Sequence, residues 1–406
     1  MKFFENGDGL TEARGFFCSG IHCDVRGNKD GKLDLGLIYS KKPCGVAGVF
    51  TTNDVKAAPV LYCQSLLEDS NARFHALIVN SGNANACTGK MGLADTIKTA
   101  KEVARHLNIH SKEVLVCSTG RIGAPLPMSR ITAGVKDATD DVINEFDGAL
   151  AFQQAILTSD TCTKSCSAKI DTSMGEITVG GVVKGAGMIE PNMATMLAFL
   201  TTDASAENSY LQSILKKAVD CSFNRITIDG DMSTNDSVIL LANGNSGVDL
   251  IKEKKSVQAA FVEAVHSVCA NLAKKCVSDG EKVTKFIKLL VKGAPNDGAA
   301  EKVARCIGNS LLVKSSWYGE DPNWGRIIDS AGYAKIGLEF ETVDLLYDEV
   351  CVLKNGEPVL ANKGTWKEIV SKKEFSITLD LKLSVGSFEI WTNDLSEEYV
   401  NFNKSE

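Results

Sequence analysis

Short apolar runs that end at polar or turn-forming residues are the main feature of the first third of the chain. Residues 46–52, 76–79 and 113–117 each predict a buried strand, because they are short, apolar and bounded by turn residues. Between the last two runs, apolar side chains recur every three or four residues from Leu93 to Leu107, which is typical of an amphipathic helix. A strand, a helix and a strand in that order predict an α/β arrangement here.

The second half of the chain has longer helical patterns and then returns to strands. Apolar positions in residues 208–221 and 256–277 recur at helical spacing, so we expect a helix in each segment. Apolar and polar residues alternate from Ile377 to Leu383, which predicts a half-buried antiparallel strand. The pattern breaks at residues 278–300, where glycine, proline and aspartate cluster, and this indicates a soft domain boundary.

Composition limits the classes to which the protein can belong. The chain has 406 residues, which exceeds one ordinary core and predicts two domains or one large layered domain. Apolar residues make up 44% and charged residues 23%, so the chain is neither disordered nor fibrous. The formal net charge of -7 disfavours nucleic acid as the main partner, although a local cationic group can still hold an acidic small molecule.

The sequence gives no sign of a membrane span, a targeting segment or a metal site. No apolar run approaches the roughly eighteen residues that a spanning helix needs, and the first residues lack the apolar core of a secretory signal, so we expect a cytoplasmic protein. The 13 cysteines form no CxxC pair, which favours reduced, mostly buried thiols. The acidic segment 229–236 lacks two residues of a calcium loop, since Thr234 replaces its glycine and Leu240 its glutamate.

A glycine-dense segment, residues 180–187, leads into the stretch that is most informative about function. Gly185 and Gly187 do not complete a dinucleotide-binding fingerprint, because the third glycine is absent. Pattern alone would make Thr195, a few residues later, an ordinary β-branched residue at the start of a strand.

Residues 184–197 nevertheless resemble the cleavage and nucleophile motif of the ornithine acetyltransferase (glutamate N-acetyltransferase) family. The resemblance extends over nearly the whole chain, because other blocks similar to those of the family occur in the family's order: residues 80–89, 118–123, 224–236, 279–287 and 321–326.

The resemblance implies an α+β fold in which β-sheets are layered between helices. It also implies that the precursor cuts itself between Ala194 and Thr195. The products would be an alpha chain, residues 1–194, with the oxyanion-hole loop, and a beta chain, residues 195–406, with a C-terminal α+β subdomain from about residue 285. The two chains would stay entwined and associate further, into a heterotetramer of two alpha and two beta chains or a larger assembly.

The family's chemistry gives Thr195 a specific role. Its hydroxyl is the implied nucleophile, and the α-amine that cleavage frees is the implied base. Such an amine has an ordinary pKa of roughly 7.7–8.0, so it accepts the hydroxyl proton near neutral pH without a histidine. The resemblance assigns the oxyanion hole to the Thr119 hydroxyl and the Gly120 backbone N–H.

The resemblance also implies the residues that bind substrate together with Thr195. Lys184 would lie near the α-carboxylate of the amino acid, and Glu281 would face the ornithine amine. Thr161 corresponds to another position that contacts substrate, and Asn403 corresponds to an asparagine that closes the site.

The implied reaction moves an acetyl group from N-acetylornithine to glutamate through an acetyl ester on Thr195, by ping-pong kinetics, as a step of arginine biosynthesis. No cofactor or metal is expected, and the sequence allows acetyl-CoA as an additional acetyl donor. Two alternatives stay open at this point. The first is an amidase or aminopeptidase, in which water replaces glutamate as the acceptor. The second is a non-catalytic small-molecule binding protein that never matures.

Overall fold

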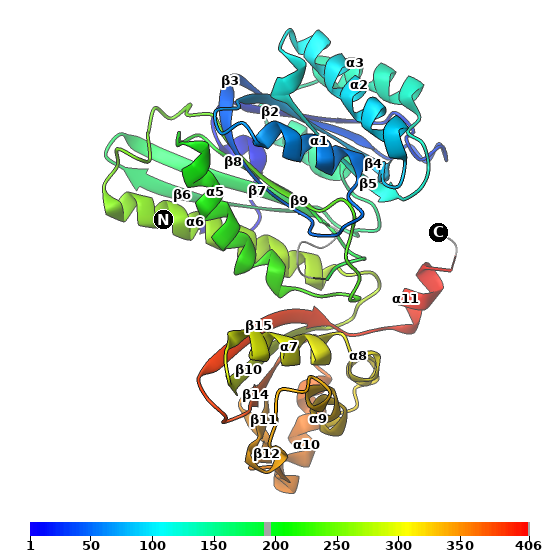
Figure 1. The fold of residues 1–406 in the computed structure, drawn as a ribbon, viewed down its shortest axis with the longest axis vertical. Helices are drawn as coiled ribbons and strands as arrows, with labels where there is room; N and C mark the ends of the chain where they lie inside the picture. The colour runs from blue at the N-terminus through cyan, green and yellow to red at the C-terminus, as the bar shows by residue number, and fades with distance from the viewer. Residues whose placement is uncertain (191–195, 405–406) are drawn as a thin grey trace. The chain divides into compact units, whose positions relative to one another are not determined.

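The computed structural model describes residues 1–190 and 196–404. The chain forms two compact units (Figure 1). The first unit comprises Met1–Ala186, Pro191–Asn224 and Met232–Cys276, and the second comprises Gly187–Glu190, Arg225–Asp231 and Val277–Glu406. The long segment of the second unit begins next to the break in sequence pattern at residues 278–300.

The first unit is built on a nine-stranded sheet in the described part of the chain. Its strands follow the order β1 (Lys2–Phe4), β6 (Lys164–Thr172), β7 (Gly175–Lys184), β8 (Leu197–Thr202), β9 (Ser237–Ala242), β3 (Leu35–Phe50), β4 (Phe74–Asn83) and β5 (Val114–Arg121), and β2 (Phe16–Ile21) pairs with β3. The pairs β4–β5 and β8–β9 are parallel, and the other pairs are antiparallel. Strand β3 joins the two halves of this sheet, because its first part pairs with β4 and its last part with β9.

Helices cover this sheet: α1 (Ala58–Leu67), α2 (Gly89–Leu107), α3 (Met128–Asp140), α4 (Phe146–Ala155), α5 (Asn208–Asp220) and α6 (Lys255–Ser278). In Figure 1, α1, α2 and α3 lie beside β3, β4 and β5. Helix α5 packs against β3 and β9, and α6 packs against β6 and β7. The predicted helices 93–107, 208–221 and 256–277 are confirmed as α2, α5 and α6. Short 3-10 turns occur at η1 (Leu10–Glu12), η2 (Ser111–Glu113) and η3 (Phe223–Arg225).

Close packing explains the glycines that precede the candidate site. A Cβ on Gly181 would lie 2.7 Å from Val268 Cγ1 and 2.9 Å from Leu272 Cδ1, so this glycine lets α6 approach β7. Elsewhere in the first unit, the rings of Phe152 and Phe199 meet edge to face at 5.7 Å. Burying an aromatic side chain of this kind contributes about 1.5–3 kcal/mol, so such contacts hold the sheet and its helices together.

The second unit has its own sheet and core. Six strands follow the order β13 (Glu357–Pro358), β12 (Val350–Lys354), β11 (Asp344–Tyr347), β14 (Glu374–Asp380), β10 (Phe286–Ala294) and β15 (Gly386–Asn393). The helical segments are α7 (Asp297–Gly308), α8 (Leu311–Tyr318), α9 (Trp324–Gly332), η4 (Phe340–Thr342), η5 (Leu360–Asn362), α10 (Lys363–Val370) and α11 (Glu397–Phe402). The expected α+β class, with sheets flanked by helices, is therefore confirmed.

One strand prediction was wrong in part. The alternating segment near residue 377 is β14, which pairs antiparallel with β11 but parallel with β10. Alternation reports that one face of a strand is buried, and it says nothing about the direction of the neighbouring strands. Within the described residues, no helix combines the length and the apolar character required to cross a bilayer.

Candidate active site

The predicted oxyanion residues lie at the carboxyl end of β5. Gly120 has a φ of +129°, and a Cβ there would lie 2.4 Å from the carbonyl carbon of Gly82, so the backbone has room only for glycine. Strands β4 and β5 run in parallel and bring Gly82 opposite Gly120. The Thr119 side chain beside it is buried, with 3% of the residue exposed.

Lys184, at the end of β7, lies in contact with Thr119. Its ammonium group is buried, with 2% of the residue exposed, and it donates to Thr119 Oγ1 at 3.3 Å and to Thr158 Oγ1 at 2.7 Å. An ammonium has only donors, so the Thr119 hydroxyl accepts from Lys184 and keeps its own hydrogen for another acceptor. The structure therefore brings together two of the residues that the sequence analysis singled out.

Asp160 organises the positive charge around Lys184. Its carboxylate lies 2.6 Å from Lys164 Nζ and 3.9 Å from Lys184 Nζ, and it accepts the N–H of Gly185 at 2.6 Å. Burial alone would raise the pKa of Asp160, but the two lysines and these hydrogen bonds lower it to about 2. Two buried ammonium groups share one carboxylate, so the cluster keeps a positive charge that suits a bound anion.

Sequence reasoning did not single out Asp160 and Thr158. The sequence feature that could have drawn attention to Asp160 is Lys164, a residue of opposite charge four positions later. The predicted contact residue Thr161 is exposed in the loop that follows Asp160.

A cavity of about 320 Å³ adjoins this cluster. Thr158 and Asp160, which both interact with Lys184, form part of its wall. Arg26 and Lys32 line another part of the cavity and add positive charge. The volume is at the lower end of the range for small-molecule sites, and it suits a ligand of the size of one amino acid.

The predicted nucleophile and cleavage site, Thr195 and Ala194, lie outside the described residues. The chain is described again from Met196, whose N–H donates to Asp236 Oδ1 at 3.0 Å. The next residue, Leu197, starts β8 and is the register partner of Lys184 in β7. The residue two positions after Thr195 therefore lies beside Lys184.

The two remaining predicted substrate residues meet in the second unit. Asn403 Nδ2 donates to Glu281 Oε2 at 3.1 Å. A Cβ on Gly187 would lie 2.5 Å from Glu281 Oε1, so this glycine allows the carboxylate to approach the backbone. In the same unit, Asp229 accepts the N–H groups of Met188 at 2.6 Å and Ile189 at 2.8 Å. These bonds hold the segment that leads toward the predicted cleavage site.

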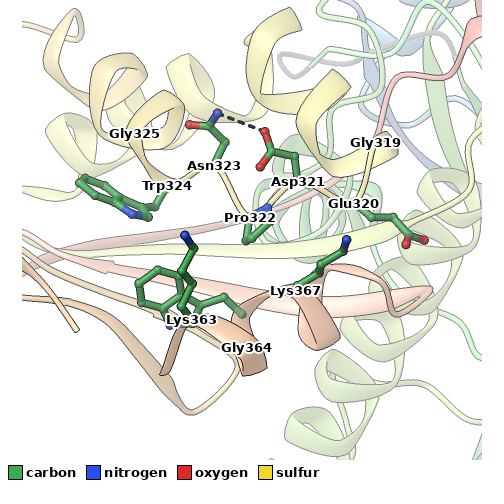
Figure 2. A pocket seen from close by; sticks show the side chains of 11 residues that line it. Gly319, Glu320, Asp321, Pro322, Asn323, Trp324, Gly325, Lys363, Gly364 and Lys367 are labelled. Carbon is green, nitrogen blue, oxygen red and sulfur yellow. Dashed lines mark hydrogen bonds between the residues drawn. The ribbon is translucent and has the colours of Figure 1, made fainter. Parts of the chain in front are cut away.

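A larger pocket of about 930 Å³ lies elsewhere in the second unit. Figure 2 shows Lys363 and Lys367 reaching toward the segment of Pro322 and Trp324, where Asn323 donates to Asp321 at 3.1 Å. None of the predicted site residues lines this pocket. Its wall includes residues 321–325, which belong to the sequence block 321–326 that resembles the family.

The described residues contain no cluster of three or more histidine, cysteine, aspartate or glutamate side chains that could hold a metal ion. The cysteines of the described chain are free thiols, several of them fully buried.

Comparison with known proteins places the chain in a family. The model of the ArgJ family matches residues 17–405. The arginine biosynthesis bifunctional protein ArgJ of Thermotoga neapolitana is 44% identical over 96% of this chain and 98% of its own length. Among solved structures, an arginine biosynthesis bifunctional protein ArgJ from Bacillus halodurans is 41% identical, with a TM-score of 0.45, and covers 48% of this chain and 98% of its own. An ornithine acetyltransferase from Mycobacterium tuberculosis, in complex with ornithine, is 38% identical, with a TM-score of 0.42, over 47% of this chain and 99% of its own. With the family model spanning nearly its whole length and a relative this similar from end to end, the chain belongs to the ArgJ family.

Proposed function

We propose that this protein cuts itself between Ala194 and Thr195 and then transfers an acetyl group from N-acetylornithine to glutamate. The observation that carries the proposal is the buried contact between Lys184 and Thr119, at the point where β8 begins. Membership of the ArgJ family and the name of the Thermotoga neapolitana relative support a role in arginine biosynthesis.

Maturation requires only the chain's own groups. The Thr195 hydroxyl attacks the carbonyl carbon of Ala194, the peptide nitrogen leaves as the Thr195 amine, and water then opens the ester that results. The amine that is released takes the proton of the Thr195 hydroxyl in each later turnover. The products, residues 1–194 and 195–406, remain associated as one enzyme, and two copies of each chain assemble into a heterotetramer or a larger complex.

Acetyl transfer then proceeds in two half-reactions at one site. Thr195 Oγ attacks the acetyl carbonyl of N-acetylornithine, and ornithine leaves with the proton that the amine held. During the attack, the Thr119 hydroxyl and the Gly120 N–H donate to the carbonyl oxygen as it becomes an oxyanion. Lys184 supports this arrangement, because its bond to Oγ1 of Thr119 directs the hydroxyl hydrogen away from the lysine.

Substrate recognition relies on charge. The Lys184, Lys164 and Asp160 cluster offers positive charge to the α-carboxylate, beside a cavity that suits one amino acid. Glu281, oriented by Asn403, offers a carboxylate to the side-chain amine of ornithine. Glutamate enters after ornithine has left and takes the acetyl group from Thr195. The reaction needs no cofactor, takes place in the cytoplasm, and accepts acetyl-CoA as a further donor if the site admits it.

Two experiments test the proposal. Intact mass and N-terminal sequencing of the purified protein should give two fragments, the second beginning at Thr195. The mature protein is then mixed with N-acetylornithine alone, followed by glutamate, and ornithine, acetate and N-acetylglutamate are measured. One equivalent of ornithine before glutamate, and N-acetylglutamate after it, supports the transferase.

The alternatives give different results in the same assays. Continuous acetate release without glutamate would identify a hydrolase, which admits water where a transferase excludes it. An uncut chain after long incubation would identify a binding protein that does not mature. Replacing N-acetylornithine by acetyl-CoA in the first step tests the second donor.

A further inference from the structure

Two adjacent residues at the start of β9 connect the two strands on which the proposed chemistry depends. Asn235 and Asp236 are both buried, with 5% and 0% of each residue exposed. They precede Ser237, the first residue of β9, which pairs with Leu197 of β8. Their side chains bind to different strands, although consecutive Cα atoms lie only about 3.8 Å apart.

Asn235 holds the strand that carries the oxyanion residues. Its side-chain amide donates to the backbone oxygen of Ser118 at 2.8 Å and to that of Ala84 at 2.6 Å. Ser118 immediately precedes Thr119, and Ala84 immediately follows β4. The amide oxygen of Asn235 accepts from the Thr234 hydroxyl at 2.6 Å, so the side chain has one orientation.

Asp236 holds the residue that follows the proposed nucleophile. Its Oδ1 accepts the N–H of Met196 at 3.0 Å, and the backbone N–H of Ser237 donates to the Met196 oxygen at 3.2 Å. Both backbone groups of Met196 are therefore fixed by the start of β9. The second carboxyl oxygen, Oδ2, is buried without a hydrogen-bond partner in the part of the chain that the structure describes.

The environment of Asp236 shifts the pKa of its carboxyl group. Burial raises its pKa well above the ordinary value, whereas the bond from Met196 and the charge of Lys184 act in the opposite direction. The polar neighbours Thr51 and Ser233 also favour its ionised form. The net effect of these surroundings favours the protonated form, and in either form Oδ1 accepts the Met196 N–H as an amide oxygen would.

We propose that Asn235 and Asp236 act together as positioning residues that set the distance between the oxyanion donors and the nucleophile. Asn235 fixes the backbone before Thr119, and Asp236 fixes the backbone after Thr195. The inference rests on the proposed function, because it assigns these residues a role in the same self-cleavage and acetyl transfer. A misplacement of about 1 Å at a reacting group costs on the order of a hundredfold in rate, so the spacing matters more for turnover than for folding.

The decisive experiment uses the different roles of the two side chains. Asp236→Asn keeps an acceptor for the Met196 N–H and should retain self-cleavage and kcat to within about threefold, because the amide oxygen can accept the same backbone N–H. Asp236→Ala removes the acceptor and should lower both rates by about a hundredfold, with KM little changed. Asn235→Asp loses the two donors to Ser118 and Ala84, so it should behave like Asn235→Ala and show no rescue.

Asn243 provides a matched control for lost stability. It is equally buried, with 5% exposed, follows the other end of β9, and donates to the Arg14 oxygen at 2.9 Å. Asn243→Ala should lower Tm about as much as Asn235→Ala and leave cleavage and kcat near wild type. Cleavage is followed by intact mass and transfer by formation of N-acetylglutamate, well below the Tm of every variant.

The outcomes separate this inference from the function on which it rests. If the wild-type chain neither cuts itself nor transfers acetyl, the proposed function fails. If the wild type is active and Asp236→Ala or Asn235→Ala loses no more activity than Asn243→Ala, the positioning role is wrong. An inactive but folded Asp236→Asn would also overturn the inference, because it would show that the carboxyl group does more than accept the Met196 N–H.

Discussion

Lys184 Nζ lies 3.3 Å from Oγ1 of Thr119, and both side chains are buried. Lys184 is the last residue of β7, and Thr119 lies near the end of β5. In the strand order of the nine-stranded sheet, β8, β9, β3 and β4 come between these two strands. The contact joins strand ends that come from distant parts of the sequence. It also orients the hydroxyl, because a lysine that donates leaves the threonine hydrogen available for another acceptor.

Thr119→Val tests this orientation directly. The substitution keeps the size of the side chain and removes the hydroxyl, so we expect kcat for acetyl transfer to fall by about 10²–10³, with KM little changed, because an oxyanion donor acts only in the transition state. Thr119→Ser keeps the donor and serves as the control, with a much smaller loss. Steady-state kinetics with N-acetylornithine and glutamate measure this. Equal losses of kcat in the two variants would show that the Thr119 hydroxyl is not an oxyanion donor.

Part of this arrangement was predictable from the sequence, for physical reasons. The helices α2, α5 and α6 were predictable because each has an apolar face that repeats at helical spacing. The contact between Lys184 and Thr119 was not, since pattern reports which face is buried and does not report which distant strands become neighbours. Resemblance to a family identified these two residues, and the structure then showed that they touch.

The surroundings of the site were the hardest part to predict. Asp160 looks like any charged loop residue until Lys164 and Lys184 lie against it. In the sequence, Asn235 and Asp236 belong only to the acidic segment 229–236, which does not complete a calcium loop. Their bonds to Ser118 and Met196 depend on the folded sheet.

Lys184→Met tests the role of the ammonium group in substrate binding. The variant keeps most of the side chain's volume and removes the charge, so we expect KM for both amino acids to rise at least tenfold, because a charged hydrogen bond to a carboxylate is worth about 1.5–3 kcal/mol. The matched variant is Lys164→Met, which removes the other lysine bound to Asp160. That variant should lower stability and change KM much less. A larger effect on KM from Lys164→Met would indicate that Lys164, and not Lys184, binds the carboxylate of the substrate.

Asp160 should make the protein sensitive to acid within a defined range. Its pKa is about 2 in the folded chain, below the ordinary 3.8, so the unfolded state binds more protons as the pH falls. The stabilisation is complete above pH 4 and is lost between about pH 4 and pH 2, and it amounts to about 2 kcal/mol. Urea unfolding of the wild type and of Asp160→Asn from pH 2 to pH 6 tests this, since the variant lacks the titrating group. The prediction would be contradicted if the free energy of unfolding changed with pH equally in the two proteins.

Thr195→Ala should abolish both self-cleavage and acetyl transfer, because it removes the hydroxyl that attacks the Ala194 carbonyl and the acetyl group in the proposed mechanism. Thr195→Ser keeps a hydroxyl and an α-amine, so it should still mature and turn over at a reduced rate. Intact mass gives the extent of cleavage, and formation of N-acetylglutamate gives turnover. A Thr195→Ala protein that appears cut at residue 195 and remains active would refute the assignment of the nucleophile.

Lys314 predicts a second pH dependence of stability, in the second unit and at higher pH. The side chain is fully enclosed, and its ammonium group donates to Asn393 Oδ1 at 2.9 Å and to Thr392 Oγ1 at 3.2 Å. Burial lowers the pKa of Lys314 to about 7, although Asp394, Asp229 and Glu190 act to raise it.

The consequence for stability follows from proton binding. Between pH 7 and pH 10.5 the unfolded chain holds a proton on this lysine that the folded chain has largely lost. The free energy of unfolding should therefore rise with pH in this range, by up to about 1.4 kcal/mol per pH unit from this group alone. Lys314→Met has no titrating group, so the stability of the wild type relative to the variant should increase from pH 7 to pH 10. Denaturant unfolding of both proteins at several pH values measures that difference, and a constant difference would mean that Lys314 keeps an ordinary pKa when buried.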